Sequence, residues 1–147
     1  MRFKRDISFE KILSLLRQQN GSPHFNAKGF AIGVFSGCFP FFGLQTLIGV
    51  FFAKLVKGNI VLAAIGTWIS NPFTYIPLYY LNYKVGSLFF NTPYSKTFEK
   101  SFVIDELWKQ GRVFSLKLLL GSFCVGLLLA VICGSIVFFL YRIKMKR

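Results

Sequence analysis

Two long uncharged stretches, each interrupted near its middle by proline, constrain the fold of this chain more than any other feature. The first covers residues 29–53 and contains Pro40, and the second covers residues 58–83 and contains Pro72. A bilayer core takes about 20 apolar residues in a helix, so each stretch is long enough to span a membrane. Backbone groups left unpaired in lipid are costly unless protein or water satisfies them. We therefore expect both breaks to be either tightly packed or functional.

A third uncharged stretch, residues 118–141, contains no proline and predicts one continuous transmembrane helix over residues 116–141. Hydrophobic residues make up 54% of the 147-residue chain, which is too apolar for an ordinary soluble protein. The predicted fold class is an all-α integral membrane protein with a single membrane domain, residues 1–147. Its two broken segments either span the bilayer or are re-entrant, and we expect a multi-pass protein. Residues 1–17 are basic, but no apolar h-region or small-residue cleavage site follows them directly, so we expect no cleaved signal peptide.

Two polar segments, residues 8–19 and 98–110, have the periodicity of amphipathic helices. Their apolar faces are formed by Phe9, Ile12, Leu13 and Leu16 in the first segment and by Val103, Ile104, Leu107 and Trp108 in the second. Basic amphipathic helices beside membrane segments lie in the interface, and we predict this position for both. For residues 8–19, packing against another part of the protein is an equally good interpretation.

The net charge of +13 is confined to the flanks and loops of the uncharged stretches. We interpret the basic residues as anchors for anionic lipid headgroups and expect no nucleic-acid partner. Six basic residues precede residue 29, two lie between the first two stretches, six lie between the second and third, and four follow the third. Three simple crossings would place one basic terminus outside, whereas a re-entrant first stretch would place both termini inside. Two re-entrant stretches would place everything inside except the C-terminus. The sequence leaves this choice open.

Small residues recur at every fourth position in the first and third stretches. One stripe consists of Gly29, Gly33 and Gly37, and the other consists of Ser122, Gly126, Ala130 and Gly134. Such a stripe lets another helix approach closely, either within the chain or in a second copy. We expect a homo-oligomer or a membrane protein partner, because so small a chain does not enclose a pathway alone.

The second break, Ser70-Asn71-Pro72-Phe73-Thr74, has the chemistry of a helix start. Asparagine is a preferred N-cap and proline is preferred at the first helical position. A helix that starts inside the membrane would present N–H groups and a positive dipole end to an anion such as a phosphate or a carboxylate. The candidate ligand-binding residues are Gln45, Thr46, Thr67, Ser70, Asn71 and Thr74, and the candidate helix-breaking residues are Gly37, Pro40, Gly43, Pro72 and Pro77. The alternative is a proline-kinked spanning helix whose polar side chains bond neighbouring helices.

The two broken stretches also resemble each other. Ala31-Ile32-Gly33 precedes Pro40 in the first, and Ala64-Ile65-Gly66 precedes Pro72 in the second. Chance and duplication explain this similarity equally well. A duplication would suggest two broken helices that meet near a pseudo-two-fold axis.

A series of glycine, proline and polar residues runs through both breaks. It comprises Gly33, Gly37, Pro40, Gly43, Gln45-Thr46, Asn59, the run Gly66-Thr67-Trp68-Ile69-Ser70-Asn71-Pro72-Phe73-Thr74, Pro77 and Gly86. In these residues, and most specifically in the Gly-Thr-Trp-x-x-Asn-Pro-x-Thr run, the chain resembles a bacterial membrane family, domain of unknown function 2062. The resemblance implies a bacterial inner-membrane location and breaks shared by the family. It implies no activity.

The sequence contains no constellation for catalysis. The acidic residues are Asp6, Glu10, Glu99, Asp105 and Glu106, all outside the uncharged stretches, and His24 is the single histidine. There is no metal-ligand spacing and no motif for a nucleophile with its base. We therefore expect no enzyme activity, no metal and no cofactor.

Two functional hypotheses remain. The first is a small carrier or flippase-like protein that binds an anionic lipid or phosphorylated substrate at the broken-helix ends, with Lys54, Lys57 and Lys84 attracting the headgroup. The alternative is a non-catalytic membrane scaffold that assembles through the small-residue stripes. Membrane lipids are expected partners in both.

Overall fold

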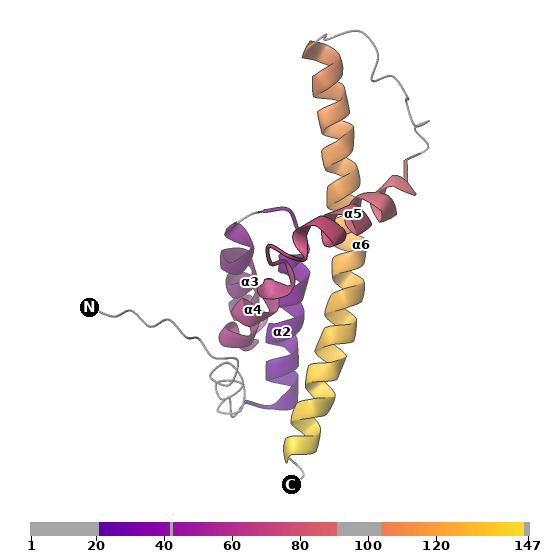
Figure 1. Cartoon of the computed structure of the whole chain (residues 1–147). Helices are drawn as coiled ribbons and strands as arrows, with labels where there is room; N and C mark the ends of the chain where they lie inside the picture. The colour runs from indigo at the N-terminus through magenta and orange to yellow at the C-terminus, as the bar shows by residue number, and fades with distance from the viewer. Residues whose placement is uncertain (1–20, 42, 91–103, 146–147) are drawn as a thin grey trace, which may run out of the picture.

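The computed structural model describes residues 21–41, 43–90 and 104–145, with side chains from residue 111 onward in the last range. The elements in these ranges are α2 (Pro23–Gly37), α3 (Leu44–Leu55), α4 (Ile60–Gly66), the 3₁₀ helix η1 (Thr67–Ile69), α5 (Tyr75–Ser87) and α6 (Ile104–Met145). No strand occurs among them, so the predicted all-helical class is confirmed for the described residues. In Figure 1, α2, α3 and α4 flank the lower half of α6, and α5 lies across it.

The helix α6 is the longest element of the structure. Its 42 residues extend for about 63 Å at 1.5 Å per residue. Within it, Gly111–Met145 is the one helix of the described residues that is long and apolar enough to cross a membrane, and its most apolar 18-residue window has a mean hydropathy of 2.8. Only 28% of its most apolar window is buried, whereas a core helix of a soluble protein would be mostly buried. The predicted long apolar helix near the C-terminus is confirmed.

The interfacial segments predicted from the sequence are only partly within the structure. Residues 104–110 form the first turns of α6 and continue into its apolar part without a break. The rest of the predicted 98–110 helix, and all of the predicted 8–19 helix, lie outside the described residues.

Each proline-interrupted stretch forms separate helices instead of one long spanning helix. In the first, α2 ends at Gly37, and α3 begins at Leu44 and runs back beside α2 (Figure 1). Gly43 precedes α3 with a φ of 82°, a left-handed conformation that glycine adopts without steric cost. In the second, Pro72 lies between η1 and α5. Pro77 interrupts no helix, because it lies in the first turn of α5, where a backbone N–H has no intrahelical partner to lose.

The glycine stripe of α2 packs against α4 within the chain. A Cβ atom added at Gly29 would meet the backbone of Asn59, one added at Gly33 would meet that of Ala63, and one added at Gly37 would meet that of Thr67. Both series advance by four residues, so α2 and α4 run parallel with their backbones in close contact. Gly66 lies against Gly33 in return, so the corresponding glycines of the two similar stretches meet.

The second stripe also packs within the chain. A Cβ atom at Gly126 would meet Phe35 and Cys38, and one at Gly134 would meet Ala31, so α6 runs antiparallel to α2. Farther along α6, the backbones of α5 and α6 cross at Gly86 and Gly121. Of the two alternatives for the stripes, packing inside one chain is the arrangement found.

Three buried asparagines satisfy backbone and side-chain groups between the helices. Asn59 caps α4 by accepting from Val61 N and Leu62 N, and it donates to Asn26 Oδ1 at 2.7 Å. Asn82 donates to Cys38 O and to Ser122 Oγ, both at 2.9 Å, and so ties α5 to the end of α2 and to α6.

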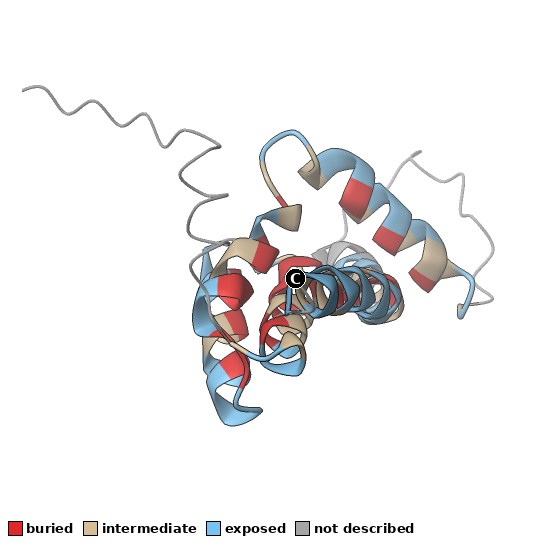
Figure 2. Ribbon diagram, turned by 90° about the horizontal axis from the view of Figure 1, so that it is seen from below, coloured by how far each residue is buried: buried red, intermediate tan, exposed pale blue. Residues whose placement is uncertain are grey.

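The apolar core is small, and most large apolar side chains face outward. Cys38, Leu78 and Val125 form its buried centre. Figure 2 shows the buried residues on the inward sides of the helices and exposed residues around the outside. Phe73 is 92% exposed and Ile76 81% exposed. Such an apolar exterior suits lipid better than water.

Candidate functional site

The first break places Gln45 inside the protein. Gln45 lies in the first turn of α3 and is 5% exposed. Its Nε2 donates to Phe39 O at 2.6 Å and to Tyr79 OH at 3.1 Å. Phe39 belongs to the connection after α2, so Gln45 satisfies a carbonyl that the break leaves without a helical partner.

The second break is closed by its own side chains. Asn71 Oδ1 accepts from Phe73 N at 2.9 Å and from Thr74 N at 3.1 Å, as an N-cap does. Tyr75 N donates to Asn71 O at 3.0 Å. The regular helix begins only at Tyr75, and the N–H groups expected to face an anion are already hydrogen-bonded.

Thr74 does not line the pocket described below, and its side chain bonds only the turn around it. Its hydroxyl donates to Ile69 O at 2.7 Å and accepts from Asn71 N at 2.9 Å. These bonds fold the turn between η1 and α5. Ligand contact is not needed to explain this side chain.

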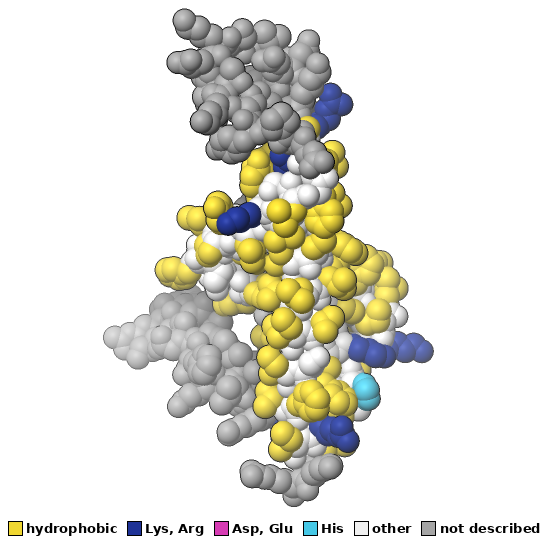
Figure 3. Space-filling model, turned by 90° about the vertical axis from the view of Figure 1, so that its right-hand side faces the viewer, with side chains coloured by type: hydrophobic (Ala, Val, Ile, Leu, Met, Phe, Trp, Pro, Cys, Tyr) yellow, Lys and Arg dark blue, Asp and Glu magenta, His cyan; other side chains and the backbone are white. Residues whose placement is uncertain are grey.

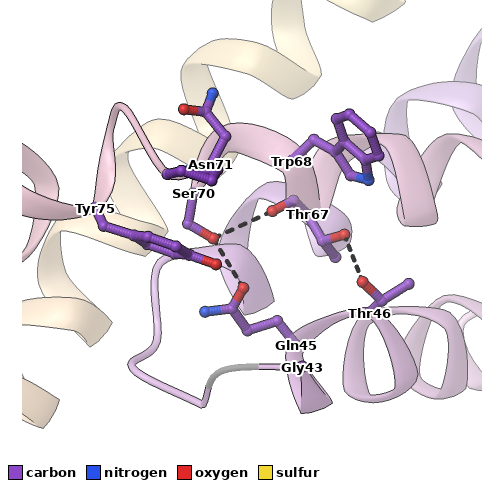
Figure 4. A pocket seen from close by; sticks show the side chains of 9 residues that line it. Gly43, Gln45, Thr46, Thr67, Trp68, Ser70, Asn71 and Tyr75 are labelled. Atoms are coloured by element: carbon purple, nitrogen blue, oxygen red, sulfur yellow. Dashed lines mark hydrogen bonds between the residues drawn. The ribbon is translucent and has the colours of Figure 1, made fainter.

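The two breaks are joined by hydrogen bonds. Ser70 Oγ donates to Gln45 Oε1 at 2.8 Å, and Thr46 Oγ1 lies 3.0 Å from Thr67 Oγ1. Thr67 donates its proton to Ala64 O at 2.7 Å, so Thr46 is the donor in the threonine pair. Figure 4 shows both links side by side.

Tyr79 extends this network to α5. Its hydroxyl accepts from Gln45 and lies 3.4 Å from Phe39 O. The hydroxyl carries a proton and donates it to that carbonyl. The buried part of the network is therefore uncharged.

A pocket of about 250 Å³ opens over this junction. It is lined by Gly43, Gln45, Thr46, Thr67, Trp68, Ser70, Asn71, Pro72 and Tyr75. Five of the six candidate ligand-binding residues thus lie around one pocket, and Thr74 does not. In Figure 4 the Tyr75 hydroxyl points toward Gln45 and Ser70, whereas the Asn71 amide points away from them.

The sequence reasoning missed Trp68 and Tyr75 as pocket residues and Tyr79 as a partner of Gln45. Trp68 is 69% exposed, and its indole N–H has no hydrogen-bond partner among the described residues. The available signal was the position of both aromatic residues beside the Ser70-Asn71-Pro72 break. Tyrosine and tryptophan commonly combine an apolar body with a polar tip at such boundaries.

The pocket is electrically neutral. No acidic, basic or histidine side chain lines it. Lys54 and Lys84, expected to attract a headgroup here, lie in the last turns of α3 and α5, whereas the pocket lies at the first turns of these helices. Among the described residues there is also no group of three or more metal-binding side chains. A ligand would meet hydroxyl, indole and amide groups.

Comparisons with known proteins identify a family and nothing closer. No curated protein and no solved structure matches the chain. One family model, described as an uncharacterized protein conserved in bacteria, matches residues 7–147. The chain therefore belongs to this bacterial family, domain of unknown function 2062, as its residues suggested.

Proposed function

We propose that this protein is a bacterial inner-membrane protein that binds the phosphate-bearing headgroup of a lipid or similar amphiphile at the junction of its two breaks, as a small carrier or flippase would. One observation carries the proposal: polar residues from both breaks meet around one pocket in an otherwise apolar exterior. Paired broken helices that meet in this way are a recurring design of substrate sites in transporters.

The charges on α6 support a transmembrane position. Lys117 and Arg142 are the cations on either side of the uncharged residues 118–141. Their separation of 25 residues corresponds to about 37 Å of helix, close to the thickness of a bilayer core with its interfaces. Figure 3 shows an apolar face between basic side chains at either end.

Packing against α6 gives the depth of the pocket in this arrangement. Cys38, at the first break, lies against Gly126. Gly126 is about 13 Å along the helix from Lys117 and about 24 Å from Arg142. The nearby helix α5 carries Tyr75, Tyr80 and Tyr83, and tyrosine is typical of the headgroup level. We place the pocket about a third of the way across the membrane from the end marked by Lys117.

The surroundings of the pocket favour an amphiphile over a free anion. A volume of about 250 Å³ lies below the roughly 300–1,000 Å³ of pockets that hold whole small molecules, and it suits a headgroup. Leu44, Leu47, Phe51 and Leu55 are each more than half exposed and form a stripe along α3 that starts beside the pocket. Acyl chains can lie along this stripe while the headgroup occupies the pocket.

We propose binding without catalysis. The pocket supplies donors such as the Trp68 indole N–H, but its lining includes no acid, base or nucleophile–base pair. The partners proposed are membrane lipids and a second copy or another membrane protein, which would complete any pathway.

A scaffold role is the second proposal, and the packing makes it weaker. Both small-residue stripes are covered by the chain's own helices, so they do not offer contact surfaces to a partner. A scaffold would have to use the outer apolar faces, which lipid covers equally well.

Native mass spectrometry of the purified full chain tests the binding proposal. Wild type is compared with Asn71→Asp and Trp68→Phe. Aspartate keeps the capping oxygen but adds a negative charge at the pocket, and phenylalanine keeps the ring but removes the indole N–H. We expect selective retention of one phosphate-bearing amphiphile by wild type and at least tenfold less by Asn71→Asp. Equal retention by all three folded proteins would refute headgroup binding in the pocket.

A further inference from the structure

Five cations from different elements gather at the end of the bundle opposite the pocket. This basic end consists of Lys28 in α2, Lys54 in α3, Lys57 after α3, and Arg142 and Lys144 in α6, all of them exposed. The basic end is a cluster of exposed cations at one end of the bundle.

Close packing holds together the three parts of the basic end, which are α2, the end of α3 with the residues after it, and the end of α6. The backbone of Gly58 touches Lys28 and Gly29, since a Cβ there would lie 2.9 Å from Gly29 N. The centroids of the His24 and Phe138 rings lie 4.7 Å apart. Phe138 is one helical turn before Arg142 in α6, so this contact joins α2 to the last part of the basic end. Figure 3 shows basic side chains on both sides of the single histidine.

The backbone at Lys57 is unusual for lysine. Its φ of 55° is left-handed, and it is the one described residue other than glycine with a positive φ. Gly58 N donates to Ala53 O at 2.7 Å and Lys57 N donates to Lys54 O at 3.2 Å, which is a Schellman motif. Glycine is the usual residue at this position, and Lys57 is exposed, so packing does not explain a lysine here.

We infer that the basic end binds the phosphates of anionic lipids in the leaflet opposite the pocket. The adjacent side chains select lipid over a soluble polyanion. Phe51, Phe52 and Leu55 are each at least half exposed beside Lys54, and a nucleic acid would leave them in water. Phosphate held by several lysines and an arginine, next to apolar side chains, is the chemistry of a membrane surface.

This site depends on the membrane position of α6 but not on the pocket, which lies about 24 Å away along the helix. Its test can therefore use the Asn71→Asp background, in which the pocket is disabled. Fluorescent phosphatidylglycerol is titrated into the full chain in an uncharged detergent. The variant K28Q/K54Q/K57Q is compared with K84Q/R112Q/K117Q, which removes the same charge at the other end.

Each cation near anionic lipid contributes roughly a fivefold effect. We expect K28Q/K54Q/K57Q to raise the Kd at least tenfold and K84Q/R112Q/K117Q to change it less than twofold. Equal losses in the two variants, or no loss in the first, would overturn the inference. Equally tight binding of a duplex DNA probe would overturn it too.

Lys57→Gly separates lipid binding from folding. Glycine relieves the left-handed backbone, so the variant should unfold at a higher temperature than wild type. It should nevertheless bind the lipid several-fold more weakly. A stabilised variant with unchanged lipid affinity would also contradict the inference.

Discussion

Ser70 donates a 2.8 Å hydrogen bond to Gln45, 25 positions earlier in the sequence, and this bond joins the two helix breaks. Gln45 also bonds Phe39 and Tyr79, so one side chain connects both breaks and α5. The breaks are therefore a shared polar junction and not two independent kinks. A protein kinked only to improve packing would not need to bring them together around a pocket.

Replacing Gln45 by leucine should destabilise the fold by about 1–3 kcal/mol, because it leaves buried polar partners without their bonds. Thr46→Val is the matched control. Thr46 is exposed, and Thr67 keeps its bond to Ala64, so we expect a loss of less than about 1 kcal/mol. Thermal unfolding in mild detergent measures both. Similar melting temperatures for the two variants would mean that the junction is not a stabilising element.

Gly33 and Gly111 offer a second matched pair. A Cβ at Gly33 collides with the backbone of Ala63, whereas one at Gly111 meets nothing within 4 Å. Gly33→Ala should cost about 1–3 kcal/mol, because α2 and α4 must move apart. Gly111→Ala should be neutral or stabilise α6 by up to about 1 kcal/mol. Unfolding midpoints for both provide the check, and tolerance of Gly33→Ala would refute the close parallel packing.

The small-residue stripe of α6 should act on folding and not on assembly. Leucine at position 126 would press on Phe35 and Cys38, so Gly126→Leu should lower the unfolding temperature. Light scattering coupled to size-exclusion chromatography tests the alternative. A folded variant that has only lost oligomers would show that the stripe faces a second chain.

The bundle suggests one orientation in the cell. The chain enters α2, turns between α3 and α4, and leaves α6 at the basic end (Figure 1). Among the cations that the structure describes, Lys28, Lys54, Lys57, Arg142 and Lys144 lie on that side, against Lys84, Arg112 and Lys117 on the other. The positive-inside tendency therefore predicts a cytoplasmic basic end.

Labelling in a cysteine-free background tests this orientation. A membrane-impermeant thiol reagent applied to intact spheroplasts should label Arg112→Cys and should reach Lys57→Cys only after lysis. The reverse pattern would contradict the orientation. Labelling of both sites before lysis would show that the copies of the chain do not all span the membrane in one fixed orientation.

The sequence predicted the parts of this fold that depend on local chemistry. The long helix α6 followed from an uncharged, proline-free stretch, and the hydrogen bonds of Asn71 are those of the predicted cap. Proline at positions 40 and 72 located both breaks. These signals are local, because capping and missing N–H groups act within one turn.

The remaining features depend on which helices meet. The same stripe of glycines fits a partner in the chain or in another copy, so only the structure shows that Gly33 packs on Ala63. Likewise, the N–H groups after Asn71 looked suited to an anion, but the Asn71 side chain occupies them. Lys54 seemed close to the site in sequence, and its helix carries it to the far end.

Photo-crosslinking in the native membrane tests headgroup binding most directly. Benzoylphenylalanine replaces Thr46, which is exposed at the pocket, or Leu128, which is 62% exposed on α6. The two sites lie at similar depth, because the first break packs against Gly126. We expect position 46 to yield adducts through the phosphate-bearing headgroup of one amphiphile and position 128 to yield acyl-chain adducts of bulk lipid. Only acyl-chain adducts at both positions would contradict a headgroup site at the junction of the breaks.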